Sequence, residues 1–509
     1  MGQYNRAMGS SDFRPATALY SANDVRELDR RASAELGVPS FELMSRAGAA
    51  ALRVLRRRWP DARSIVVLGG AGNNAGDGLV LARLAKAEGL DVRVVAVSPP
   101  ERLKGDAKRA LEQCIAAGVA IEPFTGDLPT STGAAHPIIV DALLGIGADR
   151  PLAGDFAAAV AAAGSSGAPI LALDIPSGLD ADTGWPLGDA IRATATVTFV
   201  ALKQGLYLGH ACDYTGDIEL ADLDLPASLA HGLEPALTRL EVQELRRALP
   251  PRPRSAHKGM NGRLLLLGGG PGMAGAIRLA SEAALRVGAG LVYVAAHSDS
   301  AAAVRAGRPE AIVHSIAAAA ELDDLLALAD AAVVGPGLGR SDWARACLEA
   351  VQRSGLPLVA DADALNLLAA APAARGNWVI TPHPGEAARL LGSSVEEVER
   401  DRLATVRALA ARYDAVAVLK GANTLVAAGS GPPAVCGHGN PGMASGGMGD
   451  VLSGVIGGLL VQTRDMPLSA RVGVLLHALA GDDAAAAGQR GTLAGDLMPY
   501  LRRWANPSS

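Results

Sequence analysis

The sequence predicts an α/β protein with two domains, and three observations support this. The chain has 509 residues, which is more than one hydrophobic core usually supports. Short runs rich in Val, Ile and Leu end in Gly or Asp and alternate with Ala-rich stretches of helical character, as in parallel sheets covered by helices. Aromatic residues make up only 3% of the chain while it has 60 glycines, and this composition suits helices packed closely on sheets.

The charge balance favours small-molecule partners. Lys and Arg total 47 against 52 Asp and Glu, giving a formal net charge of -5, which argues against a nucleic-acid coat or an anionic membrane surface. The four cysteines lie far apart without metal-ligand spacing, so neither a disulfide framework nor a zinc site is indicated and a cytoplasmic location is expected. We expect residues 1–15 to form a flexible tail without a targeting signal, and no apolar run is long enough to span a bilayer.

The first domain is predicted from a repeated strand and helix pattern. Its strand candidates are continuously apolar, which is typical of parallel strands buried on both faces. The Ala-rich stretches 77–89 and 105–118 lie between them and have helical character, so the order is βαβ. The expected strands lie within 64–70, 92–97, 137–145, 170–178 and 196–202.

A second series of the same kind begins after a proline-rich break. "PPRPR" at 250–254 interrupts the chain, and the charged stretch before it is expected to form a solvated helix. We therefore predict a first domain over 16–230, a linker over 231–250 and a second domain over 251–505. The expected strands of the second domain lie within 263–270, 290–296, 331–339, 357–363, 378–386 and 416–428.

Three strand ends in the first domain carry polar residues. They are "GGAGNNAGDG" (69–78), "DALLGIGADRP" (141–151) and "DIPSGLDADTG" (174–184). Ligands of open α/β sheets bind beyond the carboxyl ends of the strands. Taken singly, an Asn or Asp at such a place is more often a helix cap or a turn former.

Taken together, these strand ends indicate a polar site. The oxygens of Asn74, Asp141 and Ser177 could converge on a monovalent or divalent cation, and Asp174 would remain free to act on a substrate. Lys203 follows the next strand and could add a positive charge, although a surface position is more common for a lysine.

In this order and spacing the three motifs resemble the NAD(P)H-hydrate epimerase family over about residues 20–225. The resemblance implies a Rossmann-like, three-layer α/β/α domain, with K+ held by Asn74, Asp141 and Ser177. We expect Asp174 to do the acid/base work of epimerisation, because it is the strand-end carboxylate left after the ion takes Asp141. The residues that the resemblance assigns to the hydrated nicotinamide nucleotide are Asn73, Asn74, Ala75, Gly76, Asp77, Gly145, Ile146, Gly147, Ala148, Asp149, Arg150, Pro151 and Asp174.

A glycine-rich loop in the second domain, "SGGMGDVLSG" (445–454), predicts an anion site. Its glycines leave backbone N–H groups free, and the helix that follows adds the positive end of its dipole. A Walker A loop would need a lysine that is missing here. Asp450 is either an ordinary first-turn acid or a general base for a hydroxyl that attacks phosphorus.

Other loops of the second domain accompany this one. "KGANT" (420–424) can present Lys420 and backbone amides to a nucleotide, and "TPHPGE" (381–386) holds His383 between two prolines near Glu386. "GPGLG" (335–339) ends another strand with bare backbone.

An alternative is a dinucleotide site at "GGPGMAG". Gly270, Gly272 and Gly275 have the G-x-G-x-x-G spacing, and Asp299 follows at a distance suited to a ribose contact. This interpretation leaves the other glycine-rich and histidine-containing loops without a role.

The full set of loops closely resembles the ADP-dependent NAD(P)H-hydrate dehydratases, which have a ribokinase-like α/β fold, over about residues 240–505. The resemblance implies that Asp450 takes the proton of the substrate's ring hydroxyl while the loop stabilises the phosphoryl group leaving ADP. Mg2+ is implied by the phosphoryl chemistry, although no acidic cluster identifies its ligands. The residues implied for the hydrated cofactor are Ala276, Gly337, His383 and Asp450, and those for ADP or its AMP product are Lys420, Gly421, Ala422, Asn423, Thr424 and Gly449.

Both resemblances together imply a bifunctional repair enzyme for hydrated NADH and NADPH. It would interconvert the R and S forms of NADHX and NADPHX and dehydrate the S form with ADP, giving AMP and phosphate. We expect a homo-oligomer with small-molecule substrates and without nucleic-acid or membrane partners. Two alternatives stay open: the second domain is a small-molecule kinase, or the first is a regulatory module that only binds a nucleotide-like ligand.

Overall fold

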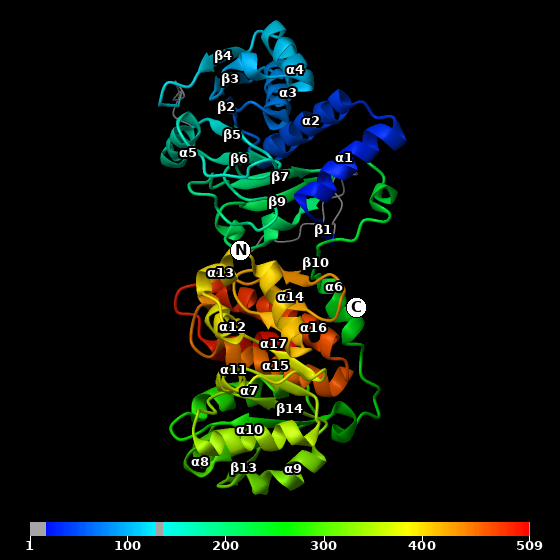
Figure 1. Ribbon diagram of the computed structural model, residues 1–509, viewed down its shortest axis with the longest axis vertical. Helices are drawn as coiled ribbons and strands as arrows, with labels where there is room; N and C mark the ends of the chain where they lie inside the picture. The colour runs from blue at the N-terminus through cyan, green and yellow to red at the C-terminus, as the bar shows by residue number, and fades with distance from the viewer. Residues whose placement is uncertain (1–16, 129–135, 508–509) are drawn as a thin grey trace. The chain divides into compact units, whose positions relative to one another are not determined.

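The computed structural model describes residues 17–128 and 136–507 (Figure 1). The chain divides after Leu237 into two compact units, called here the N-terminal and the C-terminal unit. Each contains parallel strands and helices, so the predicted α/β class is confirmed. The tail expected over 1–15 falls outside the described residues.

The N-terminal unit is built on a seven-stranded sheet in the order β4-β3-β2-β5-β6-β7-β9. All neighbouring strands of this sheet pair in parallel. The five strands expected from the sequence are present, and β4 and β9 extend the two edges. The strands are β2 (Ser64–Gly69), β3 (Asp91–Ala96), β4 (Ala120–Pro123), β5 (Ile138–Ala142), β6 (Ile170–Leu173), β7 (Ala195–Phe199) and β9 (Asp217–Ala221).

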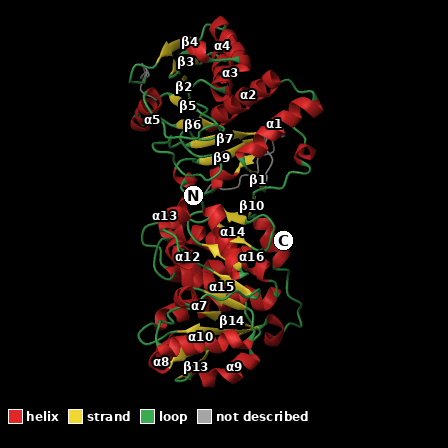
Figure 2. Cartoon of the chain, in the orientation of Figure 1, coloured by secondary structure: helices red, strands yellow, loops and turns green. Residues whose placement is uncertain are grey.

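Helices cover both faces of this sheet. Successive strand residues point to opposite sides, so each face forms its own apolar core with its helices. Ile65 and Val67 of β2 join a core with helices α1 to α4, whereas Val66 and Leu68 join a second core with α5. Helices and strands are distinguished by colour in Figure 2. The helices are α1 (Ala22–Leu36), α2 (Ser40–Arg58), α3 (Asn73–Ala87), α4 (Gly105–Ala116) and α5 (Asp155–Ser165).

The strand order reverses direction next to β2. β3 and β4 lie on one side of β2, and β5, β6, β7 and β9 lie on the other. The chain therefore leaves the carboxyl ends of β2 and β5 in opposite directions, which opens a crevice where ligands of such sheets bind. Two of the predicted polar motifs follow these strands, at Gly70 and Leu143.

The C-terminal unit has a sheet in which β13-β12-β11-β14-β15-β16-β17 run parallel. β18 and β19 continue it as antiparallel strands, and β10 pairs in parallel with β19. The strands are β10 (Leu237–Arg239), β11 (Arg263–Gly268), β12 (Leu291–His297), β13 (Ile312–Ile316), β14 (Ala331–Val334), β15 (Leu358–Ala360), β16 (Trp378–Ile380), β17 (Val416–Leu419), β18 (Thr424–Ala427) and β19 (Ala434–Cys436).

The sheet of the C-terminal unit is also buried on both faces. Leu264 and Leu266 of β11 belong to a large core with α7, α15 and α16. Leu265 and Leu267 are equally buried and point to the opposite face. The helices used below are α7 (Ala274–Arg286), α8 (Ser298–Gly307), α11 (Asp363–Ala370), α12 (Pro384–Leu391), α14 (Arg402–Tyr413), α15 (Met448–Thr463) and α16 (Met466–Ala484).

Glycines let α15 approach α7 and the sheet closely. A Cβ at Gly454 would collide with the backbone of Ala280 in α7, and one at Gly457 would collide with Val333 of β14. α15 is therefore a buried helix, with every residue from Val451 to Val461 enclosed. Its glycines fix the depth at which the amino end of α15, with Asp450, meets the strand ends.

The segment between the two expected domains is structured from Thr238 onward. β10 pairs with β19, and α6 (Val242–Ala248) packs on α16. An ion pair of 2.9 Å between Arg471 of α16 and Glu244 of α6 adds to this contact. The C-terminal unit therefore begins before the proline-rich break.

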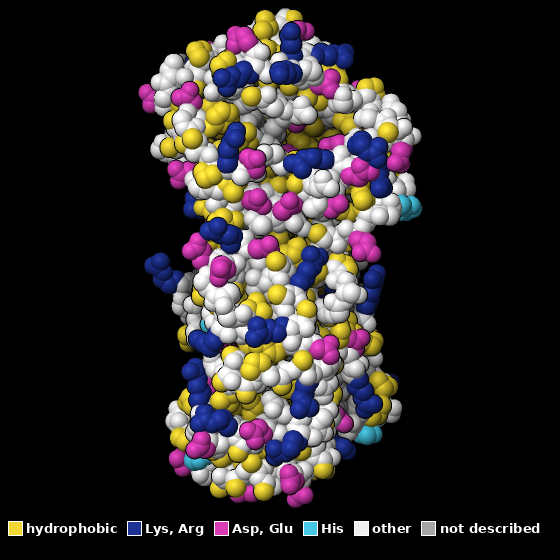
Figure 3. Space-filling view, viewed as in Figure 1, with side chains coloured by type: hydrophobic (Ala, Val, Ile, Leu, Met, Phe, Trp, Pro, Cys, Tyr) yellow, Lys and Arg dark blue, Asp and Glu magenta, His cyan; other side chains and the backbone are white. Residues whose placement is uncertain are grey.

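The visible surface carries charges of both signs. Lys and Arg side chains are interspersed with Asp and Glu on the face shown in Figure 3, without one large field of a single sign. Among the helices of residues 17–128 and 136–507, none has the length and apolar character needed to cross a bilayer.

Substituting Gly454 with Ala tests the contact between α15 and α7. We expect Gly454→Ala to lower the free energy of unfolding of the C-terminal unit by about 1–3 kcal/mol, because the added methyl group overpacks the helix crossing. Differential scanning calorimetry measures this. Gly495→Ala is the matched control, because a Cβ there meets nothing within 4 Å; equal melting temperatures for both variants would contradict the close packing.

Candidate active sites

The predicted cation ligands of the N-terminal unit meet at the crevice between β2 and β5. Asn74 lies in the first turn of α3 and is buried, and its Nδ2 donates to the carbonyl oxygen of Leu144 at 2.9 Å. Its Oδ1 is also buried but has no hydrogen-bond partner. A buried amide oxygen is costly unless a donor or a cation meets it.

Asp141 in β5 is a fully buried carboxylate. It accepts hydrogen bonds from the amide and the hydroxyl of Ser177, at 2.8 and 2.7 Å, and from the amide of Leu143 at 3.2 Å. Burial raises the pKa of Asp141 to about 6, and these hydrogen bonds oppose the rise. Within the described residues no Lys or Arg pairs with Asp141, so its charge lacks a counter-charge from the chain.

Asn74 and Ser177 share the backbone of Leu144, and Ser177 in turn donates to Asp141. The Leu144 carbonyl oxygen lies 3.1 Å from the Ser177 hydroxyl, and the Leu144 amide donates to that hydroxyl at 2.9 Å. The structure therefore brings Asn74, Asp141 and Ser177 together. In the part of the chain that is described, no group of three or more His, Cys, Asp or Glu side chains is placed to hold a metal ion. A cation here would be held by one carboxylate and neutral oxygens, which suits a monovalent ion.

Asp174 follows β6 in a strained conformation. Its φ is +67°, in the left-handed region that residues other than glycine seldom adopt, and Val200, which follows the neighbouring strand β7, has the same φ. The Asp174 amide donates to the Val197 carbonyl at 2.7 Å, and its Oδ1 accepts from the Phe199 amide at 3.3 Å. These contacts hold the carboxylate against the end of β7.

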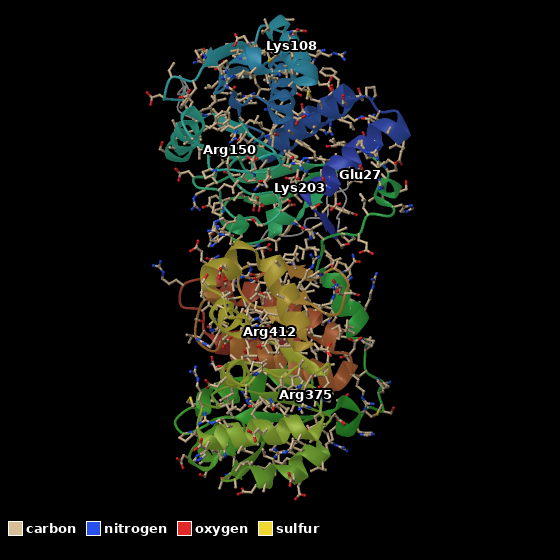
Figure 4. The ribbon with its side chains drawn as sticks, viewed as in Figure 1. Glu27, Lys108, Arg150, Lys203, Arg375 and Arg412 are labelled. Atoms are coloured by element: carbon tan, nitrogen blue, oxygen red, sulfur yellow. The ribbon has the colours of Figure 1, made fainter. Side chains whose placement is uncertain are left out.

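Lys203, which Figure 4 labels, is buried and forms an ion pair with Asp174. Its side chain is only 1% exposed, so the surface position considered from the sequence is wrong. Its ammonium donates to Asp174 Oδ1, to the Thr198 hydroxyl at 2.9 Å and to the Phe199 carbonyl at 2.7 Å. Every donor of the ammonium is used, so Lys203 serves as a fixed positive charge beside Asp174.

Two further carboxyl groups face this ion pair. Enclosure by the protein raises the pKa of Asp77 in α3 well above its ordinary value, and the negative charges of Asp174 and Asp29 add to the rise. Enclosure likewise raises the pKa of Asp29 in α1 to about 6. Solvent reaches both groups, since Asp29 is exposed and Asp77 is half-buried. Asp29 and Asp77 therefore place two solvent-accessible carboxyl groups near the ion pair of Asp174 with the buried Lys203.

The loop 145–151 begins beside Asp174 and ends at exposed residues. A Cβ at Gly145 would lie 3.5 Å from Asp174 Oδ2, and the carbonyl of Ile146 accepts from Arg26 of α1 at 3.0 Å. Farther along the predicted substrate loop, Asp149, Arg150 and Pro151 are exposed (Figure 4 labels Arg150). In the predicted stretch 73–77, Ala75 and Gly76 are buried in α3.

In the C-terminal unit Asp450 lies in the first turn of α15, as predicted. The preceding N-cap, Gly447, has φ +92°, which a residue with a side chain would rarely adopt. Burial raises the pKa of Asp450 to about 7, the negative charge of Asp361 adds to the rise, and the positive charge of Lys420 opposes it. A carboxyl group that titrates near neutral pH suits general base catalysis.

Lys420 follows β17 and forms an ion pair with Asp361. The Lys420 Nζ lies 2.7 Å from Asp361 Oδ1 and 3.9 Å from Glu386 Oε2. Asp361 follows β15, is 1% exposed, and accepts from the hydroxyls of Thr381 at 2.8 Å and Ser453 at 2.6 Å. One carboxylate thus joins the ends of β15, β16 and β17 to α15.

His383 is the N-cap of α12. Its Nδ1 accepts from the amides of Gly385 at 3.0 Å and Glu386 at 3.4 Å, and the Glu386 carboxylate accepts from the His383 amide at 2.8 Å. Enclosure and the charge of Lys420 lower the pKa of His383, which favours the neutral ring. His383 is exposed, so the ring can meet a ligand while its Nδ1 caps the helix.

Two predicted cofactor-contact residues, Ala276 and Gly337, are neighbours. Gly337 has φ +59°, and a Cβ on it would lie 3.2 Å from the Ala276 Cβ. The Gly270 amide donates to the Gly337 carbonyl at 2.7 Å, so the loop of the alternative dinucleotide site contacts the "GPGLG" loop. Asp299, the ribose ligand of that alternative, is an exposed residue in the first turn of α8.

Arg402 hydrogen-bonds to the backbone at the start of the predicted nucleotide loop 420–424. This arginine of α14 is 2% exposed and donates to the carbonyls of Leu419 and Lys420 at 3.2 and 3.0 Å. Within the loop the Thr424 hydroxyl donates to the Gly421 carbonyl at 2.9 Å. Gly449, also predicted to contact the nucleotide, lies beside Lys420, since a Cβ on it would be 3.2 Å from Lys420 Nζ.

Several site residues are missing from the sequence prediction. Asp361 ends the apolar run "PLVADAD" in the same way that Asp141 and Asp174 end theirs, so this signal was available. Thr381 and Ser453 give no such signal, because a hydroxyl residue near a strand or helix end is common. Arg402 and Asp29 lie within helices, and nothing in their local sequence points to a site.

Comparison with known proteins agrees with both halves of the chain. The family described as NAD(P)H-hydrate dehydratase matches residues 264–503, and the family described as YjeF-related protein N-terminus matches residues 40–205. A solved structure of a hypothetical protein from Streptococcus mutans is 31% identical, with a TM-score of 0.50, and covers 53% of this chain and 98% of its own.

Two curated relatives match nearly the full chain. A bifunctional NAD(P)H-hydrate repair enzyme from Coxiella burnetii is 47% identical over 96% of this chain and 100% of its own. The enzyme of the same name from Escherichia coli is 47% identical over 97% of this chain and 95% of its own. The resemblance and the enzyme class predicted from the sequence are therefore confirmed. This chain belongs to the family of bifunctional NAD(P)H-hydrate repair enzymes.

Proposed function

We propose that the C-terminal unit dehydrates the S form of hydrated NADH and NADPH at the expense of ADP, and that the N-terminal unit interconverts the R and S forms. The observation that carries the first activity is the Asp450 carboxyl, which titrates near neutral pH at the amino end of α15 beside Lys420. The ion pair of Asp174 with the buried Lys203, near the carboxyl groups of Asp29 and Asp77, carries the second.

Dehydration begins with a phosphoryl transfer. Asp450 accepts the proton of the hydroxyl on carbon six, and the oxygen attacks the β-phosphorus of ADP so that AMP leaves. The amides of the loop before α15 and the ammonium of Lys420 stabilise the negative charge on the phosphoryl oxygens. Phosphate then leaves carbon six, a proton leaves carbon five, and the dihydronicotinamide ring is restored.

The remaining predicted residues would bind the two ligands. Gly421, Ala422, Asn423, Thr424 and Gly449 line the position for the nucleotide next to Lys420. Ala276, Gly337 and His383 would contact the hydrated nicotinamide. Mg2+ would enter with ADP as the counter-ion of its phosphates; since the described residues supply no group of three or more His, Cys, Asp or Glu side chains for a metal, no step is assigned to it.

Epimerisation requires a proton transfer at the same hydroxyl. Deprotonation by Asp174 lets the bond between carbon six and the ring nitrogen open to an aldehyde, with the proton passing to nitrogen. Closure on the other face of the carbonyl inverts the stereocentre. Lys203 would hold the Asp174 carboxylate in position, and residues 73–77 and 145–151 would hold the nucleotide.

K+ would occupy the oxygen cradle of Asn74, Asp141 and Ser177. The buried, unpartnered Oδ1 of Asn74 and the buried carboxylate of Asp141 without a paired cation fit such an ion. The ion would supply the missing positive charge and fix the loop at Leu144. The expected homo-oligomer and cytoplasmic location stay predictions.

Replacing Asp450 tests the dehydratase assignment. We expect Asp450→Asn to lower kcat for the S form by about 10²- to 10⁴-fold, the usual contribution of a general base. In the parent, the rate should rise with pH through about 7, because the carboxyl must lose its proton to act as a base. The assay follows the near-ultraviolet absorbance of NADH together with phosphate release. Full activity of the variant would refute this role, and a stable phosphorylated product would favour the kinase alternative.

Replacing Asp174 tests the epimerase assignment. We expect Asp174→Asn to leave ADP-driven repair of the S form intact while clearance of the R form falls to the spontaneous rate. Asp91→Asn is the matched control, because Asp91 is an exposed residue at the amino end of β3. The measurement is the biphasic recovery of NADH from mixed epimers. An unchanged slow phase in Asp174→Asn would contradict the assignment, and its loss in Asp91→Asn would show that the effect is not specific.

Exchange of K+ tests the oxygen cradle independently of activity. We expect K+ to stabilise the parent protein in thermal unfolding relative to choline, by about 2.7 kcal/mol at a hundred times the dissociation constant. Asp141→Asn removes the one charged group among the three proposed K+ ligands, so it should abolish this stabilisation by K+. If K+ stabilises parent and variant equally, the ion binds elsewhere.

A further inference from the structure

The ammonium of Lys420 lies where it could pair with either of two carboxylates. It forms an ion pair with Asp361 at 2.7 Å. It also lies beside the turn that carries Asp450, because a Cβ on the adjacent Gly449 would be 3.2 Å from Lys420 Nζ. The same Cβ would be 3.8 Å from Asp361 Oδ2. Asp361, Lys420 and the first turn of α15 therefore meet at one point.

The surroundings of Asp361 favour its ion pair with Lys420 over a pair of Lys420 with Asp450. It is 1% exposed, and both oxygens are engaged: Oδ1 accepts from Lys420 and Thr381, and Oδ2 accepts from Ser453. Ser453 is in α15, one turn beyond Asp450, and its hydroxyl lies 2.9 Å from the Gly449 carbonyl. A buried carboxylate that lost its ammonium would be costly, so the pair with Lys420 is strongly preferred.

The Asp450 carboxylate, in contrast, has no hydrogen bond or ion pair within the described residues. It is half-buried and stands at the amino end of its helix. If Lys420 turned to it, the carboxylate would become a weaker base and would also be blocked from the substrate.

We propose that Asp361 is a positioning residue of the dehydratase site, which holds Lys420 in an ion pair and thereby leaves the Asp450 carboxylate free to accept the substrate's proton. This role rests on the proposed function of Asp450. Sequence position gives no hint of this link, since the two carboxylates are far apart in the chain.

The other charged groups of the site leave this balance unchanged. Glu386 is buried 3.9 Å from Lys420 and keeps a hydrogen bond to the His383 amide. Asp363 accepts from the Gly339 amide at 2.9 Å and lies 3.6 Å from Arg340. The groups that face Asp450 or Lys420 are Asp361, Asp363, His383, Glu386 and His477.

The decisive experiment is the pH profile of Asp361→Asn in the full-length protein, with the S form, Mg2+ and saturating ADP. The pKa of Asp450 in the parent is about 7. In the variant Lys420 is free to pair with Asp450. We therefore expect the midpoint of the acid limb, the pH range over which kcat rises, to fall by about 1–3 pH units, the effect of an adjacent opposite charge on a carboxyl pKa. We also expect kcat on the plateau to fall by about tenfold or more, because the base is weaker.

Three further variants separate positioning from a structural role. Thr381→Val removes one hydrogen bond of Asp361 but keeps the ion pair, and Asp330→Asn makes the same substitution at the opposite end of the sheet, before β14. Both should keep the parent's midpoint. In Asp361→Asn/Lys420→Met the competing ammonium is absent, so the limb should return toward the parent's pH even though the KM for ADP rises.

Several outcomes would overturn the proposal. One is an Asp361→Asn protein with reduced kcat but an unchanged acid limb, which indicates only structural damage. Another is a double variant whose limb stays at the lower pH. If Asp361→Asn fails to fold, Asp361→Ser is measured in its place with the same expectations. Failure of the proposed function is recognised separately, because Asp450→Asn would then retain the parent's rate.

Discussion

Each unit depends on a fully buried carboxylate at the carboxyl end of a parallel strand. Asp141 has this place in the N-terminal unit and Asp361 in the C-terminal unit. A buried charge is costly unless hydrogen bonds and an opposite charge compensate it. Backbone amides and the Ser177 hydroxyl therefore surround Asp141, and the hydroxyls of Thr381 and Ser453 with the Lys420 ammonium surround Asp361. The candidate catalytic residues lie close to these groups.

The two units provide the compensation differently. Asp361 pairs with Lys420, which the chain itself supplies from the neighbouring end of β17. Asp141 has hydrogen bonds but no paired cationic side chain in the described residues, and the Asn74 oxygen beside it lacks a donor. This difference is the physical reason to propose a bound cation at Asp141 and none at Asp361.

The candidate catalytic carboxylates lie close to these buried groups. They too differ in whether a cationic side chain pairs with them. Asp174 is paired with a buried lysine and held in a strained left-handed conformation. The Asp450 side chain has no hydrogen bond or ion pair within the described residues, and burial together with the negative charge of Asp361 raises its pKa to about 7. Strain is retained at such places only where the surrounding contacts hold it, as those of Lys203 do for Asp174. The close approach of α15 through its glycines similarly fixes Asp450 relative to the strand ends.

The sequence by itself determined the α/β class and the expected strands, and it predicted where both candidate sites lie, because apolar runs and the glycine and acidic residues that end them are local signals. It also predicted Asp450 at a helix start, since capping and dipole preferences act within one turn. Only the tertiary structure decided that Lys203 is buried against Asp174, that Asp361 connects Lys420 to Ser453, and that the C-terminal unit includes β10 and α6. These contacts join residues 29 to 92 positions apart or segments from opposite ends of a unit. They exist because the sheet order places particular strand ends side by side, and no local pattern of residues specifies that order.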